Sequence, residues 1–193
     1  MEISLIAGLG NPGARYACTR HNAGFMLLDR LAEKLKADSW RNWQSLGEYS
    51  KAQLPDGPLF LLKPSTYMNN SGDAVQSFAA FHKLAPEKIL VCFDDLSLDA
   101  GRIRLRRAGS DGGQRGMRDI LGKLGGDNIP RLRIGIGPRP EMIPAKDFVL
   151  APPGAEQRAA FEDGLKMAQT AVLTVLERGF ETAMNCANGA PNQ

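Results

Sequence analysis

The residue with the clearest potential for chemistry is His21, which lies in a run of polar side chains with Thr19, Arg20 and Asn22. This run follows a short apolar segment and a cluster of glycines, so it belongs to the loop after an expected strand. A histidine exchanges a proton near neutral pH and can therefore act as a general base towards water. The other histidine, His82, lies near the end of an apolar helical stretch, where we expect a surface or capping role.

A general base needs a partner that orients its ring, and Asp94 is the candidate. It follows the apolar residues 88–93, an expected strand, and would share a sheet edge with His21 if this strand runs parallel to the first one. A carboxylate bonded to one ring nitrogen leaves the other nitrogen free to accept a proton. The alternative is that Asp94 and Asp95 cap a loop or bind a divalent cation. Two acids without further nearby ligands make a poor metal site, so we expect no metal.

Asparagines gather in the loops at the same expected edge, at positions Asn11, Asn22, Asn69 and Asn70. Several amides around one base suit hydrogen bonding to a carbonyl or amide substrate and to water. Ser65 and Ser71 lack a GxSxG elbow, and Cys18 has no activating neighbours. Direct attack by water therefore fits these residues better than a covalent intermediate does.

Arginines dominate the segment 102–118, which holds six of them and one acid. Arg104 and Arg106 alternate with apolar residues, as in a half-exposed strand, and Arg131 and Arg133 repeat this pattern further along. A basic run is usually only a solvated surface. Arginines spaced along two strands beside a polar cleft indicate phosphate binding.

The run from Gly8 to Gly13 matches the GxGxxG fingerprint of dinucleotide sites. In those sites the glycines lead directly into a helix whose N-terminus binds the pyrophosphate. Here Pro12 interrupts the motif, non-periodic residues precede the helix, and no acid ends a second strand about 20 residues further on. A dinucleotide-dependent oxidoreductase is therefore the weaker hypothesis.

Strands and helices that could position these residues alternate along the chain. We expect strands at residues 3–7, 46–54, 59–63, 88–93, 102–106 and 131–136, and helices at about 22–35, 73–83, 117–124 and 156–179. Asn22 is expected to cap the first helix, and residues 38–45 to form a connection. This order predicts an α/β fold, with a single domain over residues 1–193 and a frayed tail from about residue 185. Its mixed, mainly parallel twisted sheet would be flanked by helices on both faces.

The composition is that of an ordinary globular protein, with 43% hydrophobic and 23% charged residues and a net charge of +3. The three cysteines have no zinc-binding spacing, which favours a reducing compartment. We see neither a signal peptide nor the roughly 20 apolar residues that a membrane helix needs. We therefore expect a cytoplasmic protein that does not enter a membrane.

Taken together, the motifs GLGNPGARY, TRHNAG, KPSTYMNNSG, ILVCFDDLSLDAG, RLRIGIG and DFVL resemble those of the bacterial-type peptidyl-tRNA hydrolases. The resemblance covers nearly the whole chain, and TRHNAG together with GNPG is highly specific. It implies a hydrolase that cuts the ester between the peptide and the 3′ end of tRNA, in peptidyl-tRNA that has left the ribosome early. It also implies that no metal or organic cofactor is needed, and we expect a monomer.

The resemblance also implies roles for single residues. His21 is then the general base, Asp94 the carboxylate that keeps it basic, and Asn11 the residue that separates blocked peptidyl esters from free aminoacyl-tRNA. Contacts to tRNA or peptide fall on Tyr16, Tyr67, Asn69, Arg115, Arg104, Arg106 and Arg133.

One departure from the family pattern concerns the glycine-rich loop. Where the family usually reads GGHNG, this chain has GGQRG, with Gln114 and Arg115 in the middle positions. Arg115 can hold a phosphate, but it lacks the amide chemistry of the usual asparagine. Because of this departure, the alternative hypothesis is a non-catalytic RNA-binding protein of the same fold.

Overall fold

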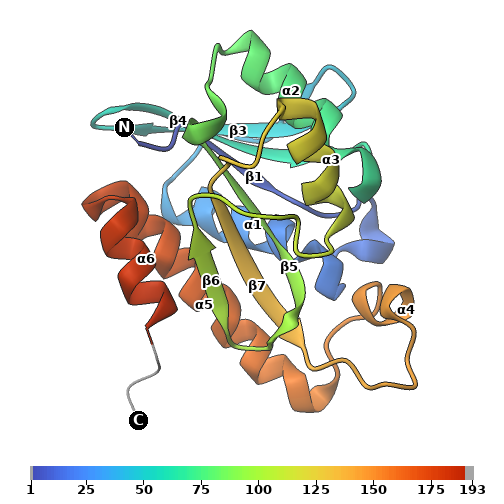
Figure 1. Ribbon diagram of the computed structural model, residues 1–193. Helices are drawn as coiled ribbons and strands as arrows, with labels where there is room; N and C mark the ends of the chain where they lie inside the picture. The colour runs from blue at the N-terminus through green and yellow to red at the C-terminus, as the bar shows by residue number, and fades with distance from the viewer. Residues whose placement is uncertain (1, 190–193) are drawn as a thin grey trace.

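A seven-stranded mixed sheet forms the centre of the computed structural model, which describes residues 2–189 (Figure 1). Its strands are β1 (Leu5–Gly8), β2 (Arg41–Trp43), β3 (Gly47–Leu54), β4 (Gly57–Pro64), β5 (Ile89–Asp99), β6 (Ile103–Arg106) and β7 (Arg131–Gly137). They lie in the order β2-β3-β4-β1-β5-β7-β6. The central strands β4, β1, β5 and β7 are parallel, whereas β2, β3 and β6 join them antiparallel. The predicted mixed sheet is confirmed.

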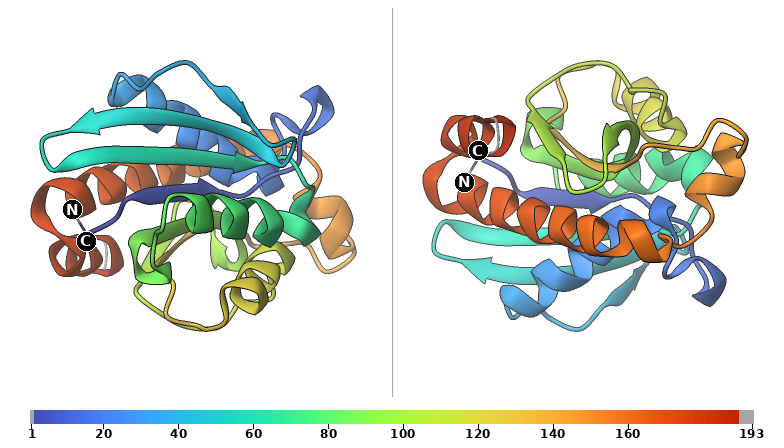
Figure 2. Two further views of the ribbon diagram at one scale, coloured as in Figure 1. Left: turned by 90° about the horizontal axis from the view of Figure 1, so that it is seen from above. Right: turned by 90° about the horizontal axis from the view of Figure 1, so that it is seen from below.

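Helices cover both faces of this sheet (Figure 2). They are α1 (Ala23–Lys34), α2 (Ser71–Phe81), α3 (Arg115–Leu124), α4 (Ala145–Val149), α5 (Ala155–Arg178) and α6 (Phe180–Asn188). Short 3₁₀ segments are η1 (Ala14–Tyr16), η2 (Arg20–Asn22), η3 (Met68–Asn70) and η4 (Pro86–Lys88). One hydrophobic cluster joins the sheet to α1, α5 and α6, and a second joins it to α2 and α3. Among the helices described, none combines the length and the apolar character needed to cross a membrane.

The first strand shows why the central strands read as continuous apolar runs. Leu5 and Ala7 are fully buried in the cluster with α2 and α3, while Ile6 between them is fully buried in the cluster with α1 and α5. Side chains alternate between the two faces of a strand, so a strand covered on both faces needs apolar residues at every position.

Three predictions about local structure are wrong, and two helices were not predicted. Asp94 and Asp95 do not follow β5 but lie inside it, because β5 continues alongside β7 as far as Asp99. The connection at 38–45 contains β2, whose polar residues become a strand only by pairing with β3. The helices α4 and α6 were not anticipated. Asn22 begins α1 without capping it, because its side chain bonds elsewhere.

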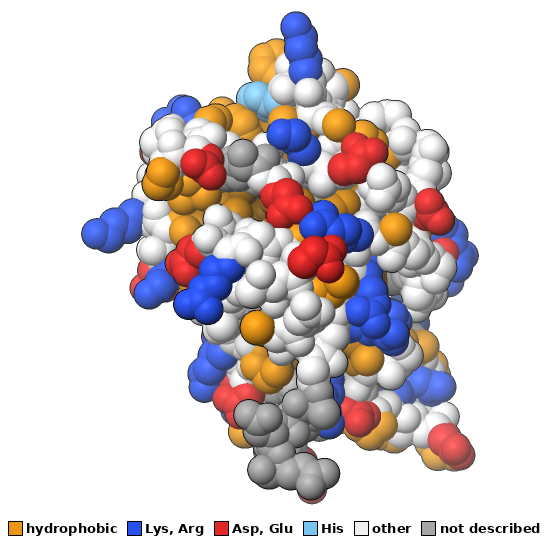
Figure 3. Space-filling view, turned by 60° about the vertical axis from the view of Figure 1, so that its left-hand side comes forward, with side chains coloured by type: hydrophobic (Ala, Val, Ile, Leu, Met, Phe, Trp, Pro, Cys, Tyr) orange, Lys and Arg blue, Asp and Glu red, His pale blue; other side chains and the backbone are white. Residues whose placement is uncertain are grey.

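The C-terminal segment is held by contacts from distant parts of the chain, so residues 185–188 are helical and not a frayed tail. Asn188 pairs with both the N–H and the C=O of Leu105, at 2.9 Å each. Arg107 forms ion pairs with Glu2 and Glu181, and this guanidinium lowers the pKa of Glu2. On the face shown in Figure 3, basic and acidic side chains are accordingly interspersed. The last part of the predicted tail, 190–193, lies outside the described residues.

Two glycines allow α1 to lie directly on β1 and β5. A Cβ atom on Gly24 would come within 2.5 Å of the carbonyl oxygen of Cys92 and would also meet the backbone of Leu9. A Cβ atom on Gly8 would come within 2.7 Å of the Leu28 side chain. Gly8, the first glycine of the apparent dinucleotide fingerprint, therefore serves close packing between the strand and the helix.

The close approach at Gly24 yields a stability prediction with a control inside the same chain. Gly24→Ala forces α1 away from the sheet, so we expect the free energy of unfolding to fall by about 1–3 kcal/mol or more. Gly122 is exposed, helical and surrounded by open space, so Gly122→Ala should raise the free energy of unfolding by up to about 1 kcal/mol. Urea denaturation of both variants measures this, and equal effects would contradict the packing argument.

Candidate active site

A cavity of about 450 Å³ opens beyond the carboxyl ends of β1 and β4, beside the second half of β5. The loop after β1 supplies Asn11 and His21, and the loop after β4 supplies Tyr67 and Asn69. The remaining wall comes from β5, the start of α3, and α4 with Leu150. Polar side chains converge here because β1 and β4 end at the same edge of the sheet, while the parallel strand β5 beside β1 continues past them.

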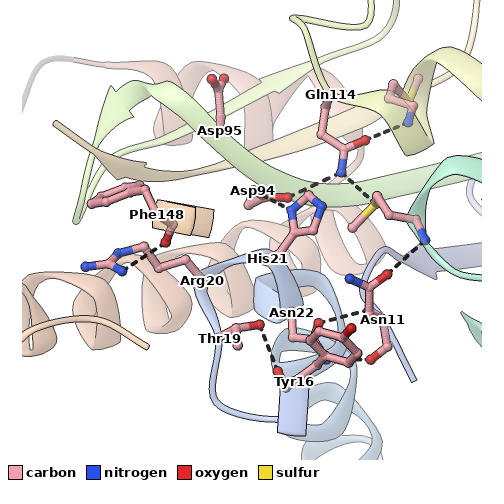
Figure 4. Close-up of polar contacts among 12 residues, drawn as sticks. Asn11, Tyr16, Thr19, Arg20, His21, Asn22, Asp94, Asp95, Gln114 and Phe148 are labelled. Carbon is pink, nitrogen blue, oxygen red and sulfur yellow. Dashed lines mark hydrogen bonds and ion pairs between the residues drawn. The ribbon is translucent and has the colours of Figure 1, made fainter. Parts of the chain in front are cut away.

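His21 and Asp94 meet in this cavity, with Nδ1 of the imidazole 2.8 Å from Oδ2 of the carboxylate (Figure 4). A carboxylate can only accept, so Nδ1 carries the proton and donates it to this bond. The lone pair of Nε2 is then available, and no other described residue bonds to it. Asp94 is only 3% exposed, and His21 is 16% exposed. The pair can therefore accept a proton from a molecule bound in the cavity.

Arg20, next to His21, ties the loop that carries His21 to α4 and the segment that follows it. Its guanidinium donates to the carbonyl oxygens of Phe148, Ala151 and Pro152 and to Oε1 of Gln157. It also stacks over the Phe148 ring at 4.0 Å (Figure 4). Burial lowers the pKa of Arg20. The four acceptor oxygens around its guanidinium replace the hydrogen bonds to water that burial removes. Arg20 therefore has a structural function, which the sequence did not indicate.

Asn11 is held in one orientation by backbone bonds. Its N–H donates to Oδ1 of Asn22 at 2.9 Å, and its carbonyl accepts from Nδ2 of Asn22 at 3.0 Å. Its own Oδ1 accepts the N–H of Met68 at 2.9 Å. This bond turns Oδ1 towards Met68, so Asn11 presents its Nδ2 donor to the cavity that it lines.

Asp95 points to the opposite side of β5 from Asp94, as alternation along a strand requires (Figure 4). It forms an ion pair with Arg133 on β7 and accepts from the N–H and hydroxyl of Ser97 at 2.8 Å each. The two carboxylates therefore diverge, and within residues 2–189 no group of three or more His, Cys, Asp or Glu side chains could hold a metal ion. Arg133 lies against Gly112, next to the cavity, with its charge matched by Asp95.

The glycine-rich loop delivers two residues to the site at the start of α3. Gln114 is buried and accepts the N–H of Met117 at 2.7 Å, which caps the helix. Its Nε2 donates to Sδ of Met68 at 2.8 Å and to Oδ1 of Asp94 at 3.3 Å. Arg115 is exposed at the first helical position and has no bonding partner in the described chain. A cation there is disfavoured by the helix dipole, so the position gains nothing for stability.

The structure brings most, but not all, of the predicted site residues together. The cavity is lined by Asn11, His21, Tyr67, Asn69, Asp94 and Arg115. Tyr16 lies in η1, outside the cavity lining. Arg104 and Arg106 lie on β6, opposite Arg133 and Arg131.

Tyr67 adopts a backbone conformation that is otherwise almost confined to glycine, with φ 59° and ψ 159°, and its side chain is 55% exposed. Strained residues of this kind concentrate at ligand sites. The sequence also missed Lys146, Val149 and Leu150, which come from α4 and the residue after it. A helix of five residues shows no period that could have indicated them.

Comparisons with known proteins identify the family of this chain. The family model described as peptidyl-tRNA hydrolase matches residues 5–193. The peptidyl-tRNA hydrolase of Carboxydothermus hydrogenoformans is 47% identical over 185 residues, covering 95% of this chain and 97% of that protein. That of Elusimicrobium minutum is 45% identical over 186 residues, covering 96% of this chain and 99% of that protein.

A crystal structure of peptidyl-tRNA hydrolase from Acinetobacter baumannii has the same fold, with a TM-score of 0.90 and 38% identity over 97% of this chain and 95% of that one. The resemblance seen in the sequence motifs is therefore confirmed at the level of the whole chain. The chain belongs to the peptidyl-tRNA hydrolase family.

Proposed function

We propose that this hydrolase cleaves peptidyl-tRNA by direct attack of water, with His21 as the general base and Asp94 as its orienting carboxylate. The observation that carries the proposal is the 2.8 Å bond between His21 Nδ1 and Asp94 Oδ2, inside a cavity lined by Asn11 and Asn69. The membership of the family supplies the substrate class, namely the ester that joins a peptide to the 3′ end of tRNA.

The reaction then needs two proton transfers through one nitrogen. His21 Nε2 takes a proton from water, whose oxygen attacks the ester carbonyl carbon. Amide donors in the cavity stabilise the negative oxygen of the tetrahedral intermediate. The bond from this carbon to the ribose oxygen breaks, and the proton on Nε2 passes to that oxygen. The products are a peptide with a free carboxyl group and a tRNA with a free 3′ end.

Asn11 is suited to recognise the blocked α-nitrogen of a peptidyl group. Its Oδ1 accepts from the N–H of Met68, and this bond orients the amide so that the Nδ2 donor faces the substrate. A blocked nitrogen carries a carbonyl oxygen that can accept this donor. The ammonium group of a free aminoacyl ester has only donors and a positive charge, so it leaves Nδ2 unpaired. This difference favours peptidyl-tRNA over aminoacyl-tRNA.

The tRNA strand is proposed to approach from the arginine side of the cavity. Arg115 lines the cavity with its charge unmatched by described residues, and Arg104 and Arg106 extend the basic surface on β6. Guanidinium groups bind phosphate in a bidentate manner. Tyr16, Tyr67 and Asn69 remain proposed contacts to the acceptor end and the peptide. Action as a monomer, in the cytoplasm and without a cofactor is also part of this proposal.

Removal of the base provides the first test of this function. We expect His21→Ala to lower the rate of peptide release from N-acetylaminoacyl-tRNA by about 10²- to 10⁴-fold. Asp94→Asn should also lower it, because an amide cannot hold the same tautomer. His82→Ala, among the aromatic side chains of Phe60 and Phe78, is the control and should retain the rate. Unchanged turnover of His21→Ala refutes the mechanism, and tight RNA binding without any wild-type turnover favours the non-catalytic alternative.

A second test concerns the discrimination by Asn11. Asn11→Asp keeps an oxygen for the N–H of Met68 and replaces the Nδ2 donor by an acceptor. We expect the ratio of kcat/KM for N-acetylaminoacyl-tRNA over aminoacyl-tRNA to fall about 10- to 100-fold, the effect of one lost hydrogen bond. Kinetics with both substrates measure this ratio. If both values of kcat/KM fall by the same factor, Asn11 acts on the base and not on the selection of substrate.

The proposed phosphate contact at Arg115 can be tested against a nearby arginine on the same helix. Arg115→Gln should raise KM several-fold with little change in kcat, and should reduce the slope of log KM against log salt by roughly one unit. Arg118→Gln is the control, because Arg118 already pairs with Asp111 at 2.7 Å. Equal effects of the two substitutions would indicate only a general charge effect.

A further inference from the structure

We propose that Gln114 is a positioning residue of the reaction, which holds the second oxygen of Asp94 while His21 holds the first. This inference rests on the proposed roles of His21 and Asp94 and goes beyond them. It assigns a function to a residue at which this chain departs from the usual pattern of the glycine-rich loop.

The two oxygens of Asp94 receive donors from two different parts of the chain. Oδ2 accepts from Nδ1 of His21 at 2.8 Å, and Oδ1 accepts from Nε2 of Gln114 at 3.3 Å (Figure 4). The bond between Asp94 and Gln114 is shielded from solvent, because Asp94 is 3% exposed and Gln114 is 7% exposed. With both oxygens held, the carboxylate has one rotamer, and the ring of His21 has one orientation.

The direction of the Gln114 amide follows from its other bond. Its Oε1 accepts the backbone N–H of Met117 at 2.7 Å, so the oxygen must face the first turn of α3. The NH₂ group is thereby turned towards Asp94 and Sδ of Met68. A reversed amide would place its oxygen against a carboxylate and its NH₂ against an N–H, with both contacts repulsive. The capping bond therefore keeps a donor aimed at Asp94.

A glutamine in this position supplies a donor whose charge does not change with pH. The other charged or titratable groups around Asp94 are Lys146 of α4, Arg115 of α3, and Asp95, which lines the same cavity and pairs with Arg133. None of these bonds to Asp94. The pH dependence of the reaction should therefore reflect His21, with no contribution from the group that holds Oδ1.

The decisive variant is Gln114→Glu, which keeps an oxygen for the N–H of Met117 and exchanges the donor for a second carboxylate beside Asp94. An added negative charge stabilises the imidazolium form. We expect the midpoint of the His21 titration, followed by its ring proton in NMR, to move up by about one pH unit. The acidic limb of kcat/KM should move with it, and kcat at pH 7 should fall about 10-fold, with KM within twofold.

Gln76→Glu is the matched control, because Gln76 donates to the carbonyl of Lys123 at 2.6 Å, at the opposite end of α3. This substitution adds the same negative charge at a side chain that also bonds to α3. It should leave the His21 titration and the pH dependence of kcat/KM unchanged. Gln114→Met, which has similar length and no charge, should lower kcat with KM unchanged, and it serves if Gln114→Glu does not fold. An unmoved His21 titration in Gln114→Glu, an equal shift in Gln76→Glu, or an unaltered kcat in Gln114→Met would overturn the proposal.

The titration and the kinetics also separate this proposal from the one on which it rests. If the His21 midpoint moves but His21→Ala remains active, then Gln114 does hold Asp94 and the assigned function of His21 is wrong. If His21→Ala is inactive and the midpoint does not move, the base is correct and Gln114 is only a helix cap.

Discussion

The burial of the Asp94 carboxylate is the constraint on which the site depends. A carboxylate removed from water is costly unless donors surround it, and Asp94 is only 3% exposed. The donors come from His21 on one loop and Gln114 on another, so folding must bring both loops over the end of the sheet. The bond that satisfies this buried charge uses Nδ1 of His21 and leaves the lone pair of Nε2 without a partner among the described residues.

The glycine-rich stretch after β1 illustrates how one sequence pattern can serve two different physical ends. In a dinucleotide site, such glycines let the backbone approach a phosphate. Here η1 and η2 come between the strand and α1, so no helix N-terminus faces the motif directly. Gly8 and Gly24 instead bring α1 against the sheet, and this contact sets where η2 places His21. The glycine at the start of the motif does allow a close approach, but what approaches it is α1 and not a phosphate.

The sheet could be predicted from the sequence because it follows from the apolar runs. The meeting of His21 with Asp94 could be predicted because β1 and β5 are parallel neighbours, although Asp94 lies inside β5 and not at its end. Other parts of the site could not. The bonds of Arg20 reach residues more than 100 positions away, and the pairing of Asn22 with Asn11 replaces the cap that local pattern predicts. The helix α4 has too few residues for a period. These features depend on which distant backbone groups lack partners, and that information exists only in the folded chain.

The arginines show that sequence spacing alone also fails to reveal the function of a charged side chain. Arg131 and Arg133 have the spacing of a phosphate-binding strand, yet Arg131 is buried and donates to the carbonyls of Ser110, Asp127 and Ile129. Those bonds hold the glycine-rich loop, and burial lowers the pKa of Arg131. Spacing therefore indicates a shared face, whereas the available partners decide whether an arginine folds the chain or binds a ligand. By that criterion Arg115, at the cavity and disfavoured by its own helix, is the arginine best explained by a ligand that carries negative charge.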